Sequence, residues 1–371
     1  MKIGILTLPL HTNYGGILQA YALQTVLERM GHEVVVMDRS PYKKLSLTQK
    51  LQYYPKRIIK KFLLWRNESV FIEEELNKAY PIVSQFTQTF IDNYIHRTEI
   101  NNLASLPKNS FDAIVVGSDQ VWRPMYYGKI ENAYLEFTGG WDIKRISYAP
   151  SFGTADWEYT TEQTVNCAKL LGKFDAVSAR EVSGVKLCKQ QFNIDAVHVL
   201  DPTFLLDADD YIQVVNKFGI SKSKGTLLNY ILDESEEKNS LIDKVAQERG
   251  LKPFRVNSKI ESLNAELEDR IQPPVEQWIR GFYDAEFVVT DSFHACVFSI
   301  IFNKPFLVVG NKARGLARFE SLLEIFDLKD RLVTSVDELD IEKFNDFDWQ
   351  KTNSILNTKR EKSINFLKIH L

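Results

Sequence analysis

The sequence predicts an α/β protein with two domains, each built on a parallel β-sheet. Three observations favour this class. Short apolar runs alternate with helical stretches, successive runs end in a polar or glycine-containing turn, and the alternation restarts near residues 205–211. A chain of 371 residues is long for a single hydrophobic core, so two domains are expected, which we set at residues 1–206 and 207–371.

The first domain opens with a strand–helix–strand unit. Lys2–Leu8 is a strand, the loop HTNYGG follows at His11–Gly16, and Ile17–Met30 has helical apolar spacing before the strand Glu33–Met37. The paired glycines let a ligand or another backbone segment come close. A nucleotide site is a second interpretation, because Asp38 stands about where a ribose-binding acid would, but the loop lacks the G-x-G-x-x-G pattern.

A helical insertion near residues 42–99 interrupts this pattern. Basic and apolar residues are mixed between Lys56 and Arg66, and an acidic helical run follows. An amphipathic basic helix of this kind can rest on an anionic membrane surface. More often such a helix packs against its own domain, and that is the expectation here.

Four further runs in the first domain predict buried strands, each followed by a polar turn. The runs are Phe111–Val116, Arg145–Ala149, Asp175–Ala179 and Val197–Leu200, and the turns are GSDQ, PSFG, ARE and DP. In a parallel sheet such turns lie along one edge, so they are expected to form one wall of a cleft.

The second domain repeats the alternation. Strands are expected at Thr226–Leu232 and Pro253–Val256, and helices at Glu236–Arg249 and Pro274–Phe282. A cationic loop with Lys312, Arg314 and Arg318 precedes a helix from about Phe319, and the last helix, 348–370, is a candidate to cross back to the first domain. Two such domains facing one another form a deep cleft, the commonest location of a small-ligand site.

The segment Ala285–Gly310 contains the strongest candidate for a functional residue. Its pattern predicts a strand, a helix capped by Asp291 or Ser292, and a second strand after Pro305. His294 then lies in the first helical turn, at the carboxyl end of a parallel strand, where unpaired backbone N–H groups favour a phosphate or carboxylate. A hydrogen-bonded structural histidine is the alternative.

Composition argues against several classes of protein. The formal net charge of -3 is unlike that of a dedicated nucleic-acid-binding protein. The N-terminal MKIGILTLPL predicts a strand and not a signal peptide, and no window approaches the roughly 18 apolar residues of a membrane span. Cys167, Cys188 and Cys296 are scattered without metal-ligand spacing, as expected of buried thiols in a reducing cytoplasm.

Seven blocks of the sequence resemble one known family. They are Asn13–Leu23, Val116–Trp122, Ser147–Gly153, Ala179–Gly184, Val199–Leu206, Thr290–Phe306 and Ala317–Leu323. Together, over residues 3 to about 330, they look like the polysaccharide pyruvyl transferase family. The resemblance implies a GT-B-like fold of two Rossmann-like domains, with the acceptor on the first and the donor on the second. It also implies transfer of a pyruvyl group from phosphoenolpyruvate to a sugar, forming a cyclic ketal.

The sequence departs from the family pattern at one position. Many members carry an Arg beside the family His, in a Ser-Arg-x-His arrangement, whereas this chain has Ser292-Phe293-His294. Either another arginine supplies that charge, or the donor differs.

Ketal formation needs an acid for the vinyl carbon, a base for the sugar hydroxyls and cations for the phosphate and carboxylate, but no metal or redox cofactor. We assign the acid to His294 and the base to Asp119. The predicted donor-binding residues are Arg180, Arg314, Arg318 and Ser292, and the predicted acceptor-binding residues are His11, Asn13, Tyr14, Gly15, Gly16 and Trp122.

Each role has a structural alternative. Arg180 can pair with Glu181 or another acid, and Asp119 can cap a helix after VGSD. Tyr14 and Trp122 can simply pack in a core.

Two other functions remain open at this point. One is a GT-B glycosyltransferase with a nucleotide-sugar donor, and the other is a non-catalytic carbohydrate-binding protein on the same scaffold. If the sugar acceptor is lipid-linked, the basic arm Lys56–Arg66 is the candidate for peripheral membrane contact, and the cytoplasmic protein would work at the inner face of the membrane.

Overall fold

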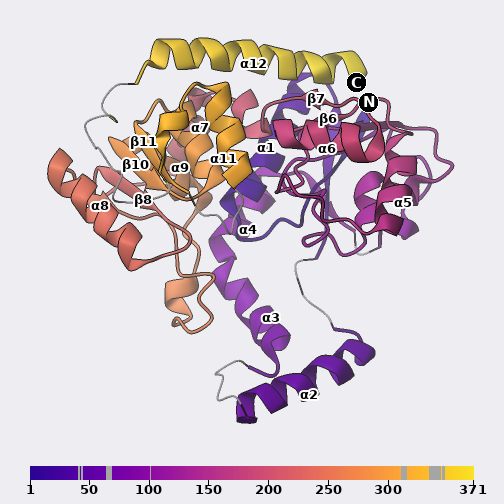
Figure 1. The fold of residues 1–371 in the computed structure, drawn as a ribbon, viewed down its shortest axis with the longest axis horizontal. Helices are drawn as coiled ribbons and strands as arrows, with labels where there is room; N and C mark the ends of the chain where they lie inside the picture. The colour runs from indigo at the N-terminus through magenta and orange to yellow at the C-terminus, as the bar shows by residue number, and fades with distance from the viewer. Residues whose placement is uncertain are drawn as a thin grey trace.

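Two five-stranded parallel sheets form the two lobes of the molecule, which confirms the predicted α/β class (Figure 1). The computed structural model describes residues 1–40, 42, 45–63, 69–100, 102–310, 316–333, 344 and 347–371. The strand order is β3-β2-β1-β4-β5 in the first lobe and β12-β11-β10-β8-β9 in the second. Each order reverses once, between β1 and β4 and between β8 and β10, and ligands of open α/β sheets bind at such reversals.

The first lobe follows the predicted alternation of elements. They are β1 (Lys2–Leu6), α1 (Tyr14–Arg29), β2 (Glu33–Asp38), β3 (Arg97–Glu99), β4 (Ala113–Val116), β5 (Lys144–Ser147), α5 (Thr161–Leu171), β6 (Ser178–Ala179), α6 (Val182–Phe192) and β7 (Val197–His198). Helix α1 begins three residues before the predicted start, because the side chain of Asn13 accepts the Gly15 backbone N–H and caps the first turn.

The second lobe is built in the same way. Its elements are α7 (Ala208–Lys217), β8 (Leu227–Tyr230), α8 (Glu236–Arg249), β9 (Pro253–Phe254), α9 (Val275–Asp284), β10 (Phe287–Thr290), α10 (Phe293–Ile301), β11 (Phe306–Val309), α11 (Leu316–Ile325) and β12 (Leu332–Val333). Helix α8 has the predicted bounds. It ends at Gly250, whose φ of 63° is the left-handed conformation that glycine adopts without strain.

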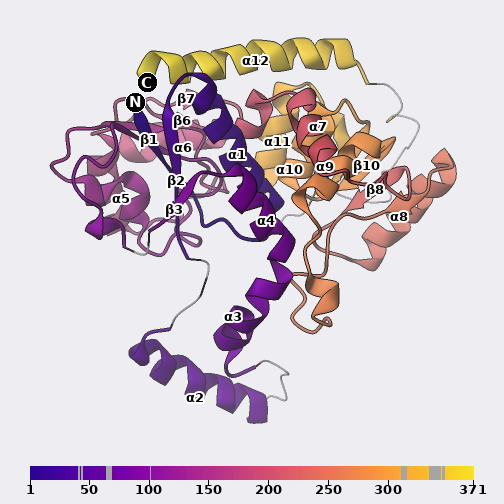
Figure 2. The ribbon, with the colours of Figure 1, turned by 180° about the vertical axis from the view of Figure 1, so that it is seen from behind.

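The insertion forms three helices, α2 (Leu47–Leu63), α3 (Ile72–Val83) and α4 (Gln85–Tyr94). Helix α4 packs on the first lobe, where Phe90 and Tyr94 meet the ring of Tyr21 edge to face. Figures 1 and 2 show that α3 extends away from α4 and the lobes, and that α2 lies apart from both lobes. The expectation that the basic helix packs against its own domain is therefore wrong for α2.

One hydrophobic core joins the two lobes. It contains Leu18 of α1, Phe204, Trp278 of α9 and Phe298 of α10, all wholly buried. The last helix, α12 (Trp349–His370), crosses both lobes on the side opposite α2 (Figure 1). Near its end the Lys144 ammonium donates to the His370 carbonyl. The lobes are thus held together by packing as well as by chain connectivity.

Candidate active site

The local structure around His294 is the predicted strand, helix and strand. β10 runs to Thr290, α10 begins at Phe293, and His294 lies in the first helical turn. Ser292 occupies the N-cap position, although its side chain makes no capping hydrogen bond. Its backbone N–H donates to Thr290 Oγ1 at 3.0 Å. Asp291, the other predicted cap, instead accepts hydrogen bonds from the backbone of Leu232 and from Lys238, and so secures β10 to the loop after β8.

A cavity of about 320 Å³ lies between the lobes, beside His294. Its walls come from the loop before α1, the loops after β8 and β10, and the segment 260–272. The lining residues are His11, Thr12, Asn13, Tyr14, Gly15, Tyr230, Leu232, Ile260, Glu261, Gln272, Trp278, Ser292 and His294. The cavity therefore adjoins a strand-order reversal in each sheet, and its volume is at the lower end of the range for small-ligand sites.

Gly15 brings the two lobes into direct contact at this cavity. A Cβ atom at position 15 would overlap the imidazole of His294. Because glycine has only a hydrogen in place of a side chain, the first turn of α1 can lie against the ring of His294. His294 is 8% exposed and lines the cavity, so its side chain is largely buried between the lobes.

Behind His294 lies a cluster of buried charged groups that the sequence only partly indicated. Asp201 accepts hydrogen bonds from Arg180 Nη1 at 2.9 Å and from Thr203 Oγ1 at 2.7 Å. The Nε2 atom of His294 is 3.6 Å from Asp201 Oδ2, which is an ion-pair distance if the ring is protonated and too long for a hydrogen bond. Arg180 also donates through Nε to Glu181 at 3.0 Å.

The electrostatics of this cluster keep Asp201 ionised. Burial alone would raise the pKa of the Asp201 carboxyl, but His294, Arg180 and the Thr203 hydroxyl outweigh it and lower that pKa. For Arg180, burial acts to lower the pKa of the guanidinium, and the opposing charges of Glu181, Asp201 and Asp119 raise it overall. An ionised Asp201, paired with the Arg180 guanidinium, thus lies beside His294.

Arg318 adds a second guanidinium to the same region. Arg180 and Arg318 lie over the ring of Phe293, with guanidinium carbons 4.6 Å and 5.9 Å from its centroid. Burial and the nearby charge of Arg180 lower the pKa of Arg318. Within the described part of the chain, Arg180 Nη2 is buried and has no hydrogen-bond partner. Two close cations with an unused donor favour an anionic ligand.

The predicted donor-binding residues therefore have different outcomes. Arg180 forms the predicted alternative pair with Glu181, and its buried Nη2 has no hydrogen-bond partner among the described residues. Arg318 lies beside it, and Ser292 lines the cavity. Arg314 lies outside the described residues.

Asp119 is near this cluster but does not cap a helix. It is 5% exposed, has a φ of 65°, and accepts the backbone N–H of Gln120 through Oδ1 at 2.8 Å. The residues that follow form turns, so the alternative role of a helix cap is wrong. The other oxygen, Oδ2, would be 3.6 Å from a Cβ at Gly16, which places the carboxylate beside the start of α1.

Among the predicted acceptor-binding residues, His11, Asn13, Tyr14 and Gly15 line the cavity, whereas Gly16 lies beside Asn13 and Asp119. Tyr14 is nearly buried. Its ring stacks on Trp278 and its hydroxyl donates to the Pro273 carbonyl across the lobes, so it offers an edge rather than a free face.

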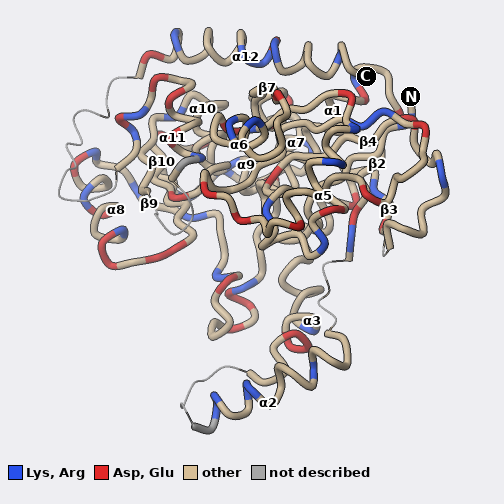
Figure 3. The backbone as a smooth tube through the Cα atoms, turned by 45° about the vertical axis from the view of Figure 1, so that its right-hand side comes forward, with Lys and Arg blue, Asp and Glu red and all other residues tan. Residues whose placement is uncertain are grey.

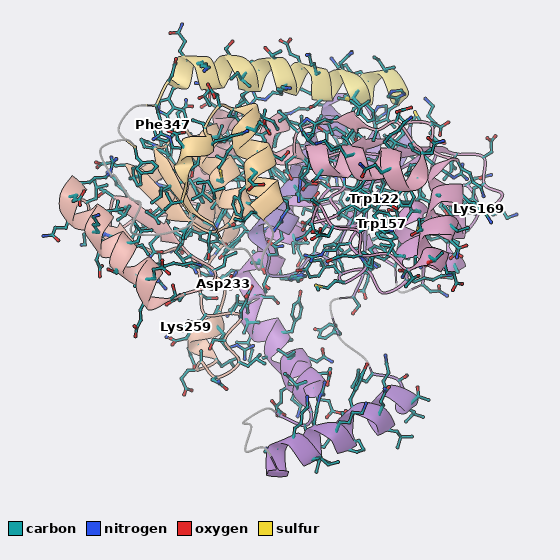
Figure 4. The ribbon with its side chains drawn as sticks, in the orientation of Figure 1. Trp122, Trp157, Lys169, Asp233, Lys259 and Phe347 are labelled. Carbon is teal, nitrogen blue, oxygen red and sulfur yellow. The ribbon has the colours of Figure 1, made fainter. Side chains whose placement is uncertain are left out.

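The prediction that Trp122 binds the acceptor is wrong. It is wholly buried, its ring lies parallel to that of Tyr134 at 5.1 Å, and Figure 4 places it inside the first lobe near Trp157. No face of its indole is open to a sugar.

The family profile described as Polysaccharide pyruvyl transferase matches residues 13–313. The chain belongs to the polysaccharide pyruvyl transferase family. This match includes Asp119, Arg180, Asp201 and His294, the buried residues at the junction of the lobes. No curated protein matches the chain.

Several solved structures resemble this family member at low sequence identity. Arabidopsis thaliana UGT89C1 complexed with quercetin is 10% identical, with a TM-score of 0.47, covering 100% of this chain and 99% of that one. A glycosyltransferase from Rickettsia africae ESF-5 is 10% identical, with a TM-score of 0.48 and coverage of 98% and 93%. E. coli ADP-heptose lps heptosyltransferase II is 11% identical, with a TM-score of 0.37 and coverage of 98% and 99%.

Proposed function

We propose that this protein transfers the pyruvyl group of phosphoenolpyruvate to a sugar of a polysaccharide or its precursor, forming a cyclic ketal and releasing phosphate. The observation that carries the proposal is the position of His294 in a family member. Its imidazole lines a polar cavity and lies 3.6 Å from Asp201, which pairs with Arg180, while Arg180 and Arg318 both lie over the ring of the adjacent Phe293.

The cavity and the two guanidinium groups suit the two substrates. Of the described residues that line the 320 Å³ cavity, none is Lys or Arg, and their amide, hydroxyl and aromatic groups, with the carboxylate of Glu261, suit a sugar. The donor carries a phosphate and a carboxylate, which match the guanidinium groups. The space beside Arg180, Phe293 and Arg318 is about 10 Å³, so we expect these side chains to move when a three-carbon donor binds.

The chemistry then follows from the proton positions. Imidazolium His294 gives a proton to the vinyl carbon of the donor, and the neighbouring carbon becomes an oxocarbenium that one sugar hydroxyl attacks. Phosphate leaves, a second hydroxyl attacks the same carbon, and the ketal closes. Asp119 accepts a proton from an attacking hydroxyl. Of the two hydroxyl protons, one replaces the proton that His294 gave to the new methyl group, and the other leaves with phosphate. The Asp201 carboxylate, 3.6 Å from His294 Nε2, is a counter-charge beside the imidazole in this step.

The first test is phosphate release by His294→Ala. A general acid typically contributes a factor of about 10² to 10⁴, so turnover of phosphoenolpyruvate with a sugar acceptor should fall by at least about a hundredfold. The far-UV circular dichroism of the variant should match the wild type. Undiminished phosphate release in a folded variant would remove His294 from the mechanism.

A second test separates this proposal from its two alternatives. Phosphoenolpyruvate should raise the midpoint of thermal unfolding, because a ligand that binds the folded state stabilises it. Arg318→Gln should reduce this shift, and Arg123→Gln, which changes an arginine paired with Glu158 elsewhere on the first lobe, should retain it. A shift with nucleotide sugars alone would favour a glycosyltransferase, and sugar binding without phosphate release under any donor would favour a carbohydrate-binding protein.

We further propose that the protein works in the cytoplasm, without nucleic acid, on an acceptor that is either a free or a lipid-linked sugar. None of the helices in the described part of the chain has the length and apolar character needed to cross a bilayer.

A further inference from the structure

Helix α2 carries an exposed apolar stripe on an arm that projects from the lobes. Leu47, Leu51 and Ile58 are 81%, 77% and 43% exposed, and their spacing places them on one side of the helix. Ile59, beside this stripe, is 54% exposed. An apolar stripe of this extent on a projecting helix is typical of a surface that binds something.

The rest of α2 is basic. The helix contains five basic residues and no acidic ones. Lys50 and Arg57 face the start of α3, where they lie 3.7 Å from Glu74 and 2.7 Å from Glu73. The other three, Lys56, Lys60 and Lys61, are exposed, and no acidic side chain among the described residues pairs with them. Figure 3 shows blue segments and no red along α2.

We propose that α2 is a docking helix for an anionic lipid bilayer. Its apolar stripe would enter the boundary between headgroups and acyl chains, while the lysines contact anionic headgroups. The whole chain carries a formal net charge of -3, so overall charge does not draw it to such a surface. The attraction must come from this local combination of apolar and basic side chains.

The arm is attached at the rim of the interlobe cavity. Gln272, which lines the cavity, donates its backbone N–H to the Val83 carbonyl at the end of α3 and its side-chain amide to the Thr12 carbonyl. Figure 4 shows Lys259, next to the cavity-lining Ile260, on the side from which the arm projects. Docking would hold the cavity near the lipid surface, which suits a lipid-linked sugar. The suitability for a lipid-linked sugar rests on the proposed function, whereas the binding of α2 to lipid does not.

Co-sedimentation of the full chain with vesicles tests the proposal. The protein should bind vesicles of phosphatidylcholine mixed with phosphatidylglycerol and bind pure phosphatidylcholine much more weakly. Lys56→Glu, Lys60→Glu and Lys61→Glu combined should weaken binding by at least about a hundredfold, since each basic residue at an anionic surface contributes a factor of about five. The matched control is Lys222→Glu, Lys362→Glu and Lys368→Glu, which makes the same change of charge at exposed positions away from α2 and should bind as the wild type does.

A second variant tests the apolar stripe. Leu47→Ser, Leu51→Ser and Ile58→Ser combined keep every charge and should also lose vesicle binding, while the thermal unfolding midpoint of the lobes stays unchanged. The proposal would be overturned if the wild-type protein did not bind the anionic vesicles. It would also be overturned if the control variant at Lys222, Lys362 and Lys368 lost as much binding as the α2 variant. So would a change of oligomeric state in these variants, measured by light scattering without lipid, because it would assign the stripe to a second copy of the chain. Binding is measured without turnover, so its failure leaves the proposed transferase activity standing.

Discussion

Asp201 connects the two halves of the candidate site at the scale of single residues. Its carboxylate contacts Arg180 and Thr203 and lies 3.6 Å from His294. Asp201→Asn keeps the shape but removes the carboxylate charge that lies beside the imidazole and pairs with Arg180, so phosphate release should fall. Steady-state rates of phosphate release measure this effect. An unchanged rate in the folded variant would assign Asp201 a purely structural role.

Asp201 also predicts how stability depends on pH. The folded state lowers its pKa, so its contribution to stability is present above the unfolded pKa of about 4 and is lost as pH falls towards the folded value. The stability difference between wild type and Asp201→Asn should therefore be constant near neutral pH and shrink below about pH 4. Denaturant unfolding at a series of pH values measures this difference, and a difference that grew in acid would contradict the assignment.

Gly15 and Gly16 are neighbours with opposite expectations. A methyl group at position 15 would overlap the ring of His294, so Gly15→Ala should cost about 1–3 kcal/mol and reduce activity. At position 16 the nearest atom would be 3.5 Å away, so Gly16→Ala should leave stability unchanged or raise it by up to about 1 kcal/mol. Thermal unfolding of the two variants measures this difference in stability. Similar losses of stability at both positions would show that the ring of His294 does not restrict the side chain at position 15.

At the scale of elements, the sequence was informative where a pattern is local. The strand–helix–strand around His294 and the bounds of α8 follow from apolar spacing, caps and a terminal glycine. The burial of Trp122 was not predictable, because the direction of one indole depends on distant partners such as Tyr134. The position of α2 was missed because an amphipathic pattern shows an apolar face without showing what covers it.

The candidate site was predictable only in part for the same reason. His294, Arg180 and the loop before α1 each end or begin a regular element, which identified them in the sequence. Asp201 was visible as a polar turn after a strand, but its contacts with Arg180 and His294 join residues far apart in the chain. Such contacts follow from the packing of two lobes and have no local periodicity.

Helix α12 gives a prediction at this scale. The Arg360 guanidinium donates to the carbonyls of Phe204 and Leu206, in the segment where the chain passes between the lobes. Arg360→Ala leaves two buried carbonyl groups with fewer partners and should cost about 1–3 kcal/mol. Lys362→Ala, an exposed change on the same helix, should cost less than about 0.5 kcal/mol. Equal effects in denaturant unfolding would contradict a specific role for Arg360.

At the scale of the whole molecule, the arrangement of the core predicts how the lobes unfold. One cluster of buried side chains runs from α1 through Phe204 to α9 and α10, and α12 crosses both lobes above it. Neither lobe can lose its structure without exposing apolar side chains of the other. We therefore expect one calorimetric transition, with equal calorimetric and van't Hoff enthalpies, despite the two sheets.

Truncation after Asp348 tests the contribution of α12 to this coupling. The deletion removes Leu356, Phe366 and Leu367, which are buried against the lobes, at a cost of about 5 kcal/mol. The unfolding midpoint should fall and the single transition should broaden or divide, because the remaining core alone then joins the lobes. Two separate transitions in the full-length protein would show that the lobes are independent, and the close contact of Gly15 with His294 would then be one state of an opening cleft.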